Sequence, residues 1–235
     1  MGRVSPGSLS LIGENKEAEK RLTLPSQIHF QLKYGHKSRK SIHMKLYPPY
    51  KGASKLHITQ PFGVNPNSYQ PNGHTGVDFA SQYGTFLTAP ENVKIEKVIT
   101  PENIDNSFSS LERGYGVLMK SMSEPDLYYL YWHCLPVFPV KVGDYVEGGR
   151  IVAQMGNSGM SFHAGQLVPL SERVSGKLGT HLHYERAYWK NGKYEYTNVL
   201  PYIDWDLKVS DSVWQIEVLT AIKICYEKII GLFKK

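Results

Sequence analysis

The sequence has little that would cross-link the chain or place it in a membrane. Its 235 residues include only two cysteines, Cys134 and Cys225, which excludes a multi-disulfide scaffold and a four-cysteine metal site. It contains no apolar run of about 18 residues, so we expect no membrane-spanning helix. Residues 1–25 also lack the apolar stretch of a secretory signal. If the protein acts outside a cell, these residues do not explain how it is exported.

The net charge of the chain does not determine the class of its partner. The formal net charge is +6 and the isoelectric point is about 9.1, which suits an anionic partner such as a nucleic acid, a lipid surface or an anionic cell wall. The sequence has no long basic run, zinc-finger spacing or RNA-binding aromatic signature. Nucleic acid is therefore not an expected partner.

The residues that are abundant are typical of a β-rich protein. Sixteen tyrosines and 21 glycines favour strands and turns, and 41% hydrophobic residues are enough for a globular core. Between residues 56 and 200, short apolar runs alternate with clusters of Gly, Pro, Asn and Asp. This pattern predicts strands at 92–100, 115–120, 127–133 and 150–156, and the segment 140–156 has two strand-like pieces around the turn VEGG.

We expect the chain to have three parts: an N-terminal extension over residues 1–50, a β domain over 51–206 and a C-terminal helix over 207–235. The extension is polar and basic. The helix is predicted because apolar residues recur at steps of three and four, at Val218, Leu219, Ile222, Cys225, Ile229 and Phe233. Ser210 or Asp211 can cap its start. Packing on its own domain, self-association and contact with a membrane surface are all open functions for this amphipathic helix.

The stretch GTHLHYERA, residues 179–187, carries two histidines and a glutamate at alternate positions. In an extended strand, His181, His183 and Glu185 share one face. A metal ion between the two imidazoles would explain this arrangement. A surface strand that happens to carry histidines would explain it equally well.

A second motif, NGHTGVDFA, places His74 four residues before Asp78, with glycines that permit a tight bend into a strand near Val77. An imidazole and a carboxylate suit zinc, and a third ligand from His181 or His183 would leave one position for water. In LYWHCLP, His133 alone would be a packed or surface residue. Beside the other two motifs, His133 becomes a candidate for proton transfer.

The order of six motifs resembles that of the lysostaphin/LytM-type zinc metalloendopeptidases, β-rich enzymes that cut the peptide part of peptidoglycan. The motifs are GHTGVD (73–78), GYG (114–116), YWH (131–133), VKVGDYVEGGRIV (140–152), GNSG (156–159) and HLHYE (181–185). The resemblance spans roughly residues 56–190. It implies a mainly β fold, an antiparallel sheet or sandwich of the LytM-like duplicated hybrid type.

The resemblance also implies the roles of five residues. His74, Asp78 and His183 would hold one Zn²⁺ per chain, and His133 and His181 would be the catalytic histidines flanking the water that zinc activates. Bacterial peptidoglycan would be the partner and the cell wall the place of action, outside the cell, in the periplasm or by phage delivery. The missing secretory signal favours a phage-type or otherwise non-classically delivered lysin.

The residues agree with this chemistry. No HExxH motif is present, so a histidine is the reasonable general base because its pKa lies near neutrality. Which of the two histidines accepts the proton is open. We interpret Glu185 as a residue that supports a ligand from behind or lies at the surface, rather than as a ligand.

The sequence departs from the usual pattern of this family in two places. Residues 160–179 form an insertion, which we expect to line or cover the cleft, and its His163 is more typical of an exposed loop histidine than of a site residue. A tyrosine that assists the oxyanion in some members has no clear counterpart, although Tyr69 lies in the right region.

Three other functions are weighed against this one. A catalytically inactive LytM-like module would bind the cell wall or regulate another hydrolase, but it would be expected to have lost metal ligands. A lipoyl or biotinyl carrier shares the VKVGDYVEGG hairpin, yet no suitable lysine motif is present. A cysteine peptidase would need Cys134 to reach His133, and adjacent strand residues point to opposite faces.

Overall fold

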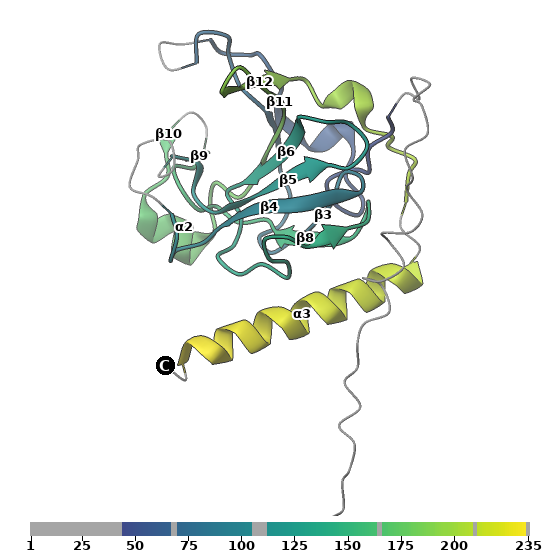
Figure 1. Ribbon diagram of the computed structural model, residues 1–235. Helices are drawn as coiled ribbons and strands as arrows, with labels where there is room; N and C mark the ends of the chain where they lie inside the picture. The colour runs from purple at the N-terminus through teal and green to yellow at the C-terminus, as the bar shows by residue number, and fades with distance from the viewer. Residues whose placement is uncertain (1–43, 67–69, 105–111, 164–165, 209–210, 234–235) are drawn as a thin grey trace, which may run out of the picture. The chain divides into compact units, whose positions relative to one another are not determined.

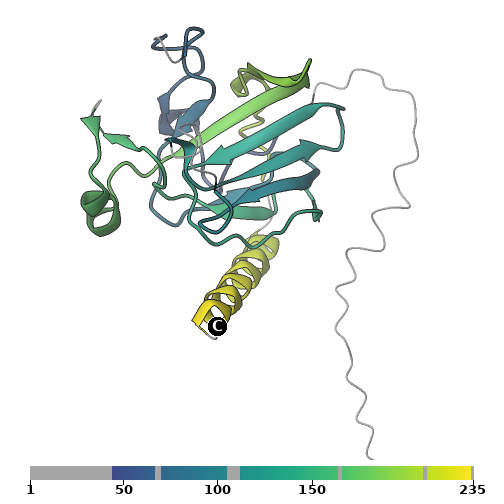
Figure 2. The same cartoon turned by 60° about the vertical axis from the view of Figure 1, so that its left-hand side comes forward.

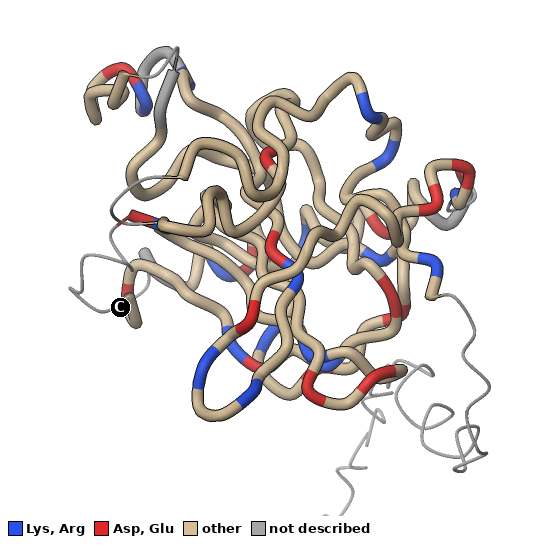
Figure 3. The backbone as a smooth tube through the Cα atoms, turned by 90° about the horizontal axis from the view of Figure 1, so that it is seen from above, with Lys and Arg blue, Asp and Glu red and all other residues tan. Residues whose placement is uncertain are grey.

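The computed structural model describes residues 44–66, 70–104, 112–163, 166–208 and 211–233. Ser41–Lys235 forms one compact unit (Figure 1). Most of the predicted N-terminal extension, together with Tyr69, lies outside the described residues. Residues 1–43 carry eight Lys or Arg against three Asp or Glu, which is most of the formal net charge of +6. Over the described chain, basic and acidic positions are interspersed (Figure 3).

An eight-stranded sheet, counted over the described residues, forms the centre of the unit, and all its pairings are antiparallel. Its strands follow the order β1 (Ile58–Gln60), β2 (Val77–Phe79), β11 (Leu182–Lys190), β6 (Leu127–Trp132), β5 (Gly116–Ser121), β4 (Val93–Ile99) and β7 (Tyr145–Val146). The last strand, β12 (Lys193–Thr197), pairs with the far end of β11. The predicted mainly β, antiparallel fold is confirmed.

Smaller elements surround this sheet. β3 (Phe86–Thr88) pairs with β8 (Ile151–Gln154), and β9 (Phe162–His163) pairs with β10 (Gln166–Leu167). The described residues also include the short 3₁₀ helices η1 (Lys55–His57) and η2 (Leu200–Tyr202), and helix α2 spans Leu170–Gly176. β9, β10 and α2 lie within the predicted insertion, which therefore has secondary structure of its own.

Alternation along the central strands separates the core from the functional face. Tyr129 and Tyr131 of β6 and Tyr184 of β11 point into the core, where the rings of Tyr131 and Tyr184 meet edge to face at 4.8 Å. Because successive strand residues face opposite ways, Trp132 and His183 lie on the other face of the sheet. That face carries the candidate site.

The C-terminal helix α3 (Asp211–Phe233) is confirmed, and β3 and β8 lie between it and the central sheet (Figures 1 and 2). Of the residues that the periodicity emphasised, Cys225 faces the domain, whereas Leu219, Ile222 and Ile229 are exposed. Ala221 and Cys225 are buried, and the Lys228 ammonium donates to the carbonyl of Phe138. The exposed apolar residues of this helix are Ile216, Leu219, Ile222, Tyr226 and Ile229. Among the described residues, no helix has the length and apolar character needed to cross a membrane.

The predicted domain boundaries after residues 50 and 206 stay predictions. Leu46 and Tyr50, before the first boundary, are buried in the same core as the sheet. Leu46 also forms a bridge with Ile203 and exchanges backbone hydrogen bonds with Tyr202 and Asp204. Any shortened chain therefore needs to keep residues from about 44 onward.

Candidate metal centre

Two neighbouring strands bring Asp78 and His183 together. In the antiparallel pairing of β2 with β11, these two residues lie directly opposite each other. Directly opposite residues of an antiparallel pair have their side chains on the same face, a few ångströms apart. The Nδ1 atom of His183 lies 2.9 Å from Oδ1 of Asp78. Register alone therefore places an imidazole against a carboxylate.

His74 reaches the same point from the loop before β2. Its backbone N–H donates to the carbonyl of Val64, and its carbonyl accepts from the N–H of Gly63. Two glycines make the approach feasible: at Gly73 (φ +78°) a Cβ would lie 2.3 Å from the carbonyl oxygen of Gly63, and at Gly76 it would lie 3.0 Å from the ring of His183. Side chains at these two positions would block the turn.

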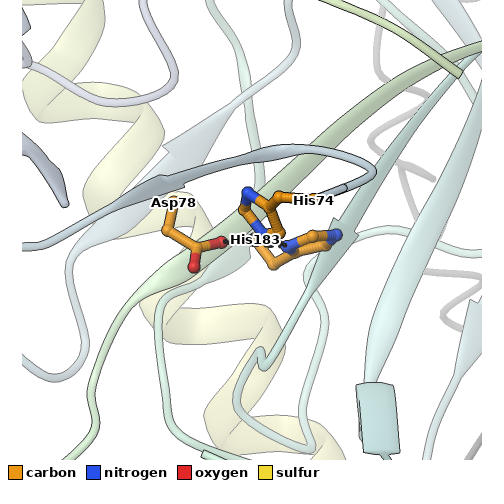
Figure 4. A group of neighbouring side chains, drawn as sticks. All are labelled: His74, Asp78 and His183. Atoms are coloured by element: carbon orange, nitrogen blue, oxygen red, sulfur yellow. Dashed lines mark hydrogen bonds and ion pairs between the residues drawn. The ribbon is translucent and has the colours of Figure 1, made fainter. Parts of the chain in front are cut away.

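The donor atoms of His74, Asp78 and His183 form a tight triangle (Figure 4). The Nε2 atom of His74 lies 2.9 Å from Nδ1 of His183 and 3.2 Å from Oδ1 of Asp78. All three residues are buried, with exposed fractions of 5% to 8%. They form the one cluster of at least three potential ligands found among the described residues.

The other nitrogen of each ring determines which tautomer is present. Nδ1 of His74 donates to the carbonyl of Pro61 at 3.2 Å, and Nε2 of His183 lies 3.2 Å from the Glu185 carboxylate. With a hydrogen on each of these nitrogens, and a metal ion in place of the proton on His183 Nδ1, the lone pairs of His74 Nε2 and His183 Nδ1 would both face the point beside Oδ1 of Asp78. This arrangement leaves three electron-pair donors around one point.

Glu185 supports His183 from behind. Its side chain is fully buried and accepts hydrogen bonds from Thr75 at 2.7 Å and from the indole of Trp132 at 2.8 Å, with the guanidinium of Arg113 at 3.4 Å. Of the two interpretations of Glu185 made from sequence, the supporting role fits and the surface role is wrong. Arg113, Trp132 and Thr75 were not predicted to belong to the site, although Trp132 and Thr75 lie inside two of the six motifs.

The charges in this cluster favour a cation at its centre. Burial alone would lower the pKa of His183, but hydrogen bonds to Asp78 and Glu185 outweigh burial and raise that pKa to about 9. Burial alone would raise the pKa of Asp78, but its contacts with His183 and His74 lower it well below the usual range. Two carboxylates thus stabilise positive charge on the ring between them, and a bound metal ion would supply that charge instead.

His133 lies beside the cluster at the end of β6, in a left-handed backbone conformation with φ +60°. A positive φ is uncommon for a residue other than glycine and recurs at functional sites. The GNSG loop holds the side chain, because Nδ1 donates to the carbonyl of Ser158 at 2.7 Å while the Ser158 hydroxyl donates to the carbonyl of Cys134. In the same loop, Gly159 packs so closely on Gly114 that a Cβ on either glycine would clash.

His181 faces His133, with ring centroids 4.4 Å apart. Its Nδ1 donates to the carbonyl of Gly179 at 2.8 Å, and its Nε2 lies 3.9 Å from Oδ2 of Asp78. Burial, together with neighbouring imidazoles, lowers the pKa of His133 well below its usual value. Burial also lowers the pKa of His181. Both rings are therefore neutral near pH 7, with Nδ1 occupied and Nε2 able to accept a proton.

The three donors fit zinc. Zinc–ligand bonds of about 2.0–2.1 Å in a tetrahedron separate neighbouring donor atoms by about 3.3 Å, close to the 2.9–3.2 Å between the atoms of this cluster. Two imidazole nitrogens and one carboxylate oxygen are typical zinc ligands, and three protein ligands leave a coordination position open. His74, Asp78 and His183 would hold the ion, and zinc would supply Lewis-acid chemistry there.

The remaining sequence candidates take no part in this cluster. Cys134 is fully buried, and burial raises the pKa of its thiol far above the usual value; an activated nucleophile would need a lowered pKa. The side chain of His163, like Tyr69, lies outside the described part of the molecule. The insertion is tied to the GNSG loop, because the Asn157 side chain donates to the carbonyls of Arg173 and Leu178. Its expected role at the cleft stays a prediction.

Comparison with known proteins points to one family. The sequence profile of peptidase family M23 matches residues 72–195, a stretch that includes all five predicted site residues. No curated protein matches the chain.

Similar folds occur among solved structures. LytU is 24% identical, over 72% of this chain and 90% of that one, with a TM-score of 0.45. The catalytic domain of lysostaphin, an antimicrobial peptidase from Staphylococcus simulans, is 23% identical over 62% of this chain and 90% of that one, with a TM-score of 0.44. A variant of the catalytic domain of the prophage-encoded M23 protein EnpA from Enterococcus faecalis is 26% identical over 59% and 85%, with a TM-score of 0.40.

Proposed function

The chain belongs to peptidase family M23, and we propose that it is a zinc metalloendopeptidase that hydrolyses peptide bonds in the stem peptides or cross-bridges of bacterial peptidoglycan. One Zn²⁺ per chain is held by His74, Asp78 and His183. The observation that carries this proposal is the triangle of three donor atoms 2.9–3.2 Å apart, with two neutral imidazoles beside it. The cell wall is the proposed place of action.

Zinc bound at this site would polarise the scissile carbonyl and lower the pKa of the attacking water. His133 and His181 are proposed to handle the protons. Each ring has its Nδ1 hydrogen engaged with a backbone carbonyl, so each Nε2 is held as an acceptor at a fixed position. One Nε2 accepts the proton of the water. The other histidine takes up a proton from solvent at its Nε2 and then stabilises the oxyanion or protonates the leaving amine.

The lowered pKa values of both histidines support their proposed role in proton transfer. A neutral ring is ready to accept a proton at pH 7, and the resulting imidazolium, buried and next to other histidines, readily gives its proton up. An inactive binding module would not need His133 in a strained backbone conformation with its Nδ1 anchored. These features favour the enzyme over the module.

The test is digestion of purified peptidoglycans that differ in cross-link chemistry, with mass spectrometry of the fragments. We expect cleavage of peptide bonds, complete loss of cleavage on chelation of the metal, and recovery on addition of zinc. Alkylation of thiols should have no effect, because Cys134 and Cys225 are both buried. Full cleavage in excess chelator would contradict the metal mechanism.

We further propose that helix α3 is dispensable for the chemistry. It lies outside residues 72–195 and contacts the domain on the side of β8, whereas the metal ligands lie on β2, β11 and the loop before β2. A chain that ends near Asp206 should fold and cleave a short soluble peptide at the native rate. If that chain folds but loses zinc or activity, the helix belongs to the catalytic domain.

A further inference from the structure

A cavity of about 400 Å³ lies on the side of β2 away from the metal cluster. The ring of Trp205, which lines this cavity, packs on Phe79 at 6.3 Å between centroids. Phe79 follows Asp78 in β2, so their side chains leave the strand on opposite faces. The cavity is therefore separate from the site that holds the ligands, and its volume is that of a small-molecule site.

Four of its twelve lining residues are aromatic. Tyr47, Tyr50, Trp205 and Trp214 all line the cavity, so two of the four tryptophans of the chain meet here. They come from three separate segments: the stretch before η1, the stretch after η2 and the first turn of α3. Flat rings of this kind present a negative face to a ligand and attract weakly polarised C–H groups.

Polar groups of both signs surround these rings. The Lys51 ammonium contacts the carboxylate of Asp211 at 2.5 Å and lies 5.9 Å from the ring centre of Trp214. Lys208 adds a second ammonium to the lining and is exposed. The cavity thus offers hydrogen-bond donors and an acceptor within reach of the aromatic faces.

This combination discriminates between classes of ligand. The Asp211 carboxylate disfavours an anion and the two lysines disfavour a cation. Because Lys51 and Asp211 already pair with each other, the lining carries little unbalanced charge, and a purely apolar ligand would make no use of its remaining donors and acceptors. An uncharged ring with apolar C–H faces and hydroxyls at its edge satisfies all of them, because hydroxyls both donate and accept. A pyranose sugar has this structure.

We propose that this cavity binds a pyranose unit of a glycan strand, at a site distinct from the one that cuts the peptide. The inference rests on the proposed function, because peptidoglycan carries N-acetylated sugars alongside the peptides. Sugar bound here would hold the insoluble substrate while the metal centre, on the other face of β2, acts on an attached peptide. Tethering raises the rate of cleavage of the insoluble polymer, because the peptide is held near the metal centre. It does not change the cleavage of a short peptide that carries no sugar.

The experiment titrates ¹⁵N-labelled native protein with the β-1,4-linked tetramer of N-acetylglucosamine and follows the four tryptophan indole N–H signals. The signals of Trp205 and Trp214 should shift, whereas those of Trp132 and Trp189 should not. Trp214→Leu should weaken binding about fivefold or more, the scale of one lost aromatic contact. Trp189→Leu is the matched control, because Trp189 is 43% exposed on β11 and outside the cavity.

A second variant covers the case in which Trp214→Leu loosens helix α3. Replacing Lys208 and Asp211 together by alanine removes polar partners from exposed positions, and it should also weaken binding about fivefold. No binding of the tetramer at millimolar concentration, or equal affinity of native protein and both variants, would overturn the proposal. Cleavage of a short soluble peptide is measured in parallel and should be native in Trp214→Leu, while release of fragments from insoluble peptidoglycan falls. If no peptide is cut but the tetramer binds at Trp205 and Trp214, the proposed function fails and the sugar site stands.

Discussion

Replacing Glu185 by glutamine is expected to weaken zinc binding without touching any of the three ligands. In the native protein, Oε1 of Glu185 accepts from Thr75 at 2.7 Å and lies 3.2 Å from Nε2 of His183, while Oε2 accepts from the Trp132 indole at 2.8 Å. Glutamine has the same shape but only one oxygen. Whichever way the amide is turned, its nitrogen faces at least one buried donor.

The size of the effect follows from these contacts. A buried donor left without an acceptor costs about 1–3 kcal/mol of folding free energy, and Arg113 also loses its carboxylate partner. Without a negative charge behind it, His183 becomes a weaker electron-pair donor. Removing such a supporting group typically lowers metal affinity about 10–100-fold, which is the change expected for Glu185→Gln.

Competition with a chromophoric chelator measures the zinc affinity, and thermal unfolding of the metal-free protein measures the stability. Glu195→Gln on the neighbouring strand β12 is the matched control, because Glu195 is a half-exposed partner of Lys190. Native zinc affinity in Glu185→Gln would refute the reasoning. A loss of stability with unchanged affinity would mean that Glu185 supports the fold and not the ligand.

Three further substitutions and one change of condition test the same site. His183→Ala should lose zinc and peptide cleavage together, whereas His181→Ala should keep about one zinc per chain while the rate falls about 10²–10⁴-fold. The zinc content and the cleavage rate of each purified variant test this assignment. The reverse pattern would exchange the roles of the two histidines. Gly76→Ala places a Cβ 2.7 Å from the carbonyl of Tyr184 and 3.0 Å from the His183 ring, so its zinc affinity should fall, and native affinity would show that the ring can move aside. Burial alone would raise the pKa of Glu185, but its contacts with His183 and Arg113 outweigh burial and lower that pKa to about 2 from 4.5. The stability that ionised Glu185 contributes is therefore present above about pH 4.5 and is lost as pH falls towards 2. As the pH is lowered over this range, the free energy of unfolding should fall more steeply for the native protein than for Glu185→Gln.

Much of this protein could be predicted from short stretches of its sequence. Apolar runs bounded by turn residues predicted β4, β5, β6 and β8 within a residue or two, because strand formation depends mainly on local periodicity and turn residues. The alternation in HLHYE placed His183 and Glu185 on one face, since the side-chain period of a strand is two. The steps of three and four after residue 210 likewise predicted α3.

Only the tertiary structure determines which residues elsewhere in the chain contact those stretches. The residues of HLHYE left open whether His181 or His183 would complete the group formed by His74 and Asp78, and the register of β2 against β11 places His183 opposite Asp78. The burial of Glu185 and the apolar face that α3 leaves exposed also depended on partners elsewhere in the chain. Periodicity reports which side chains share a face, but it carries no information about the surface that covers that face. Register and packing join residues some 50 to 110 positions apart, and only the folded chain brings these partners together.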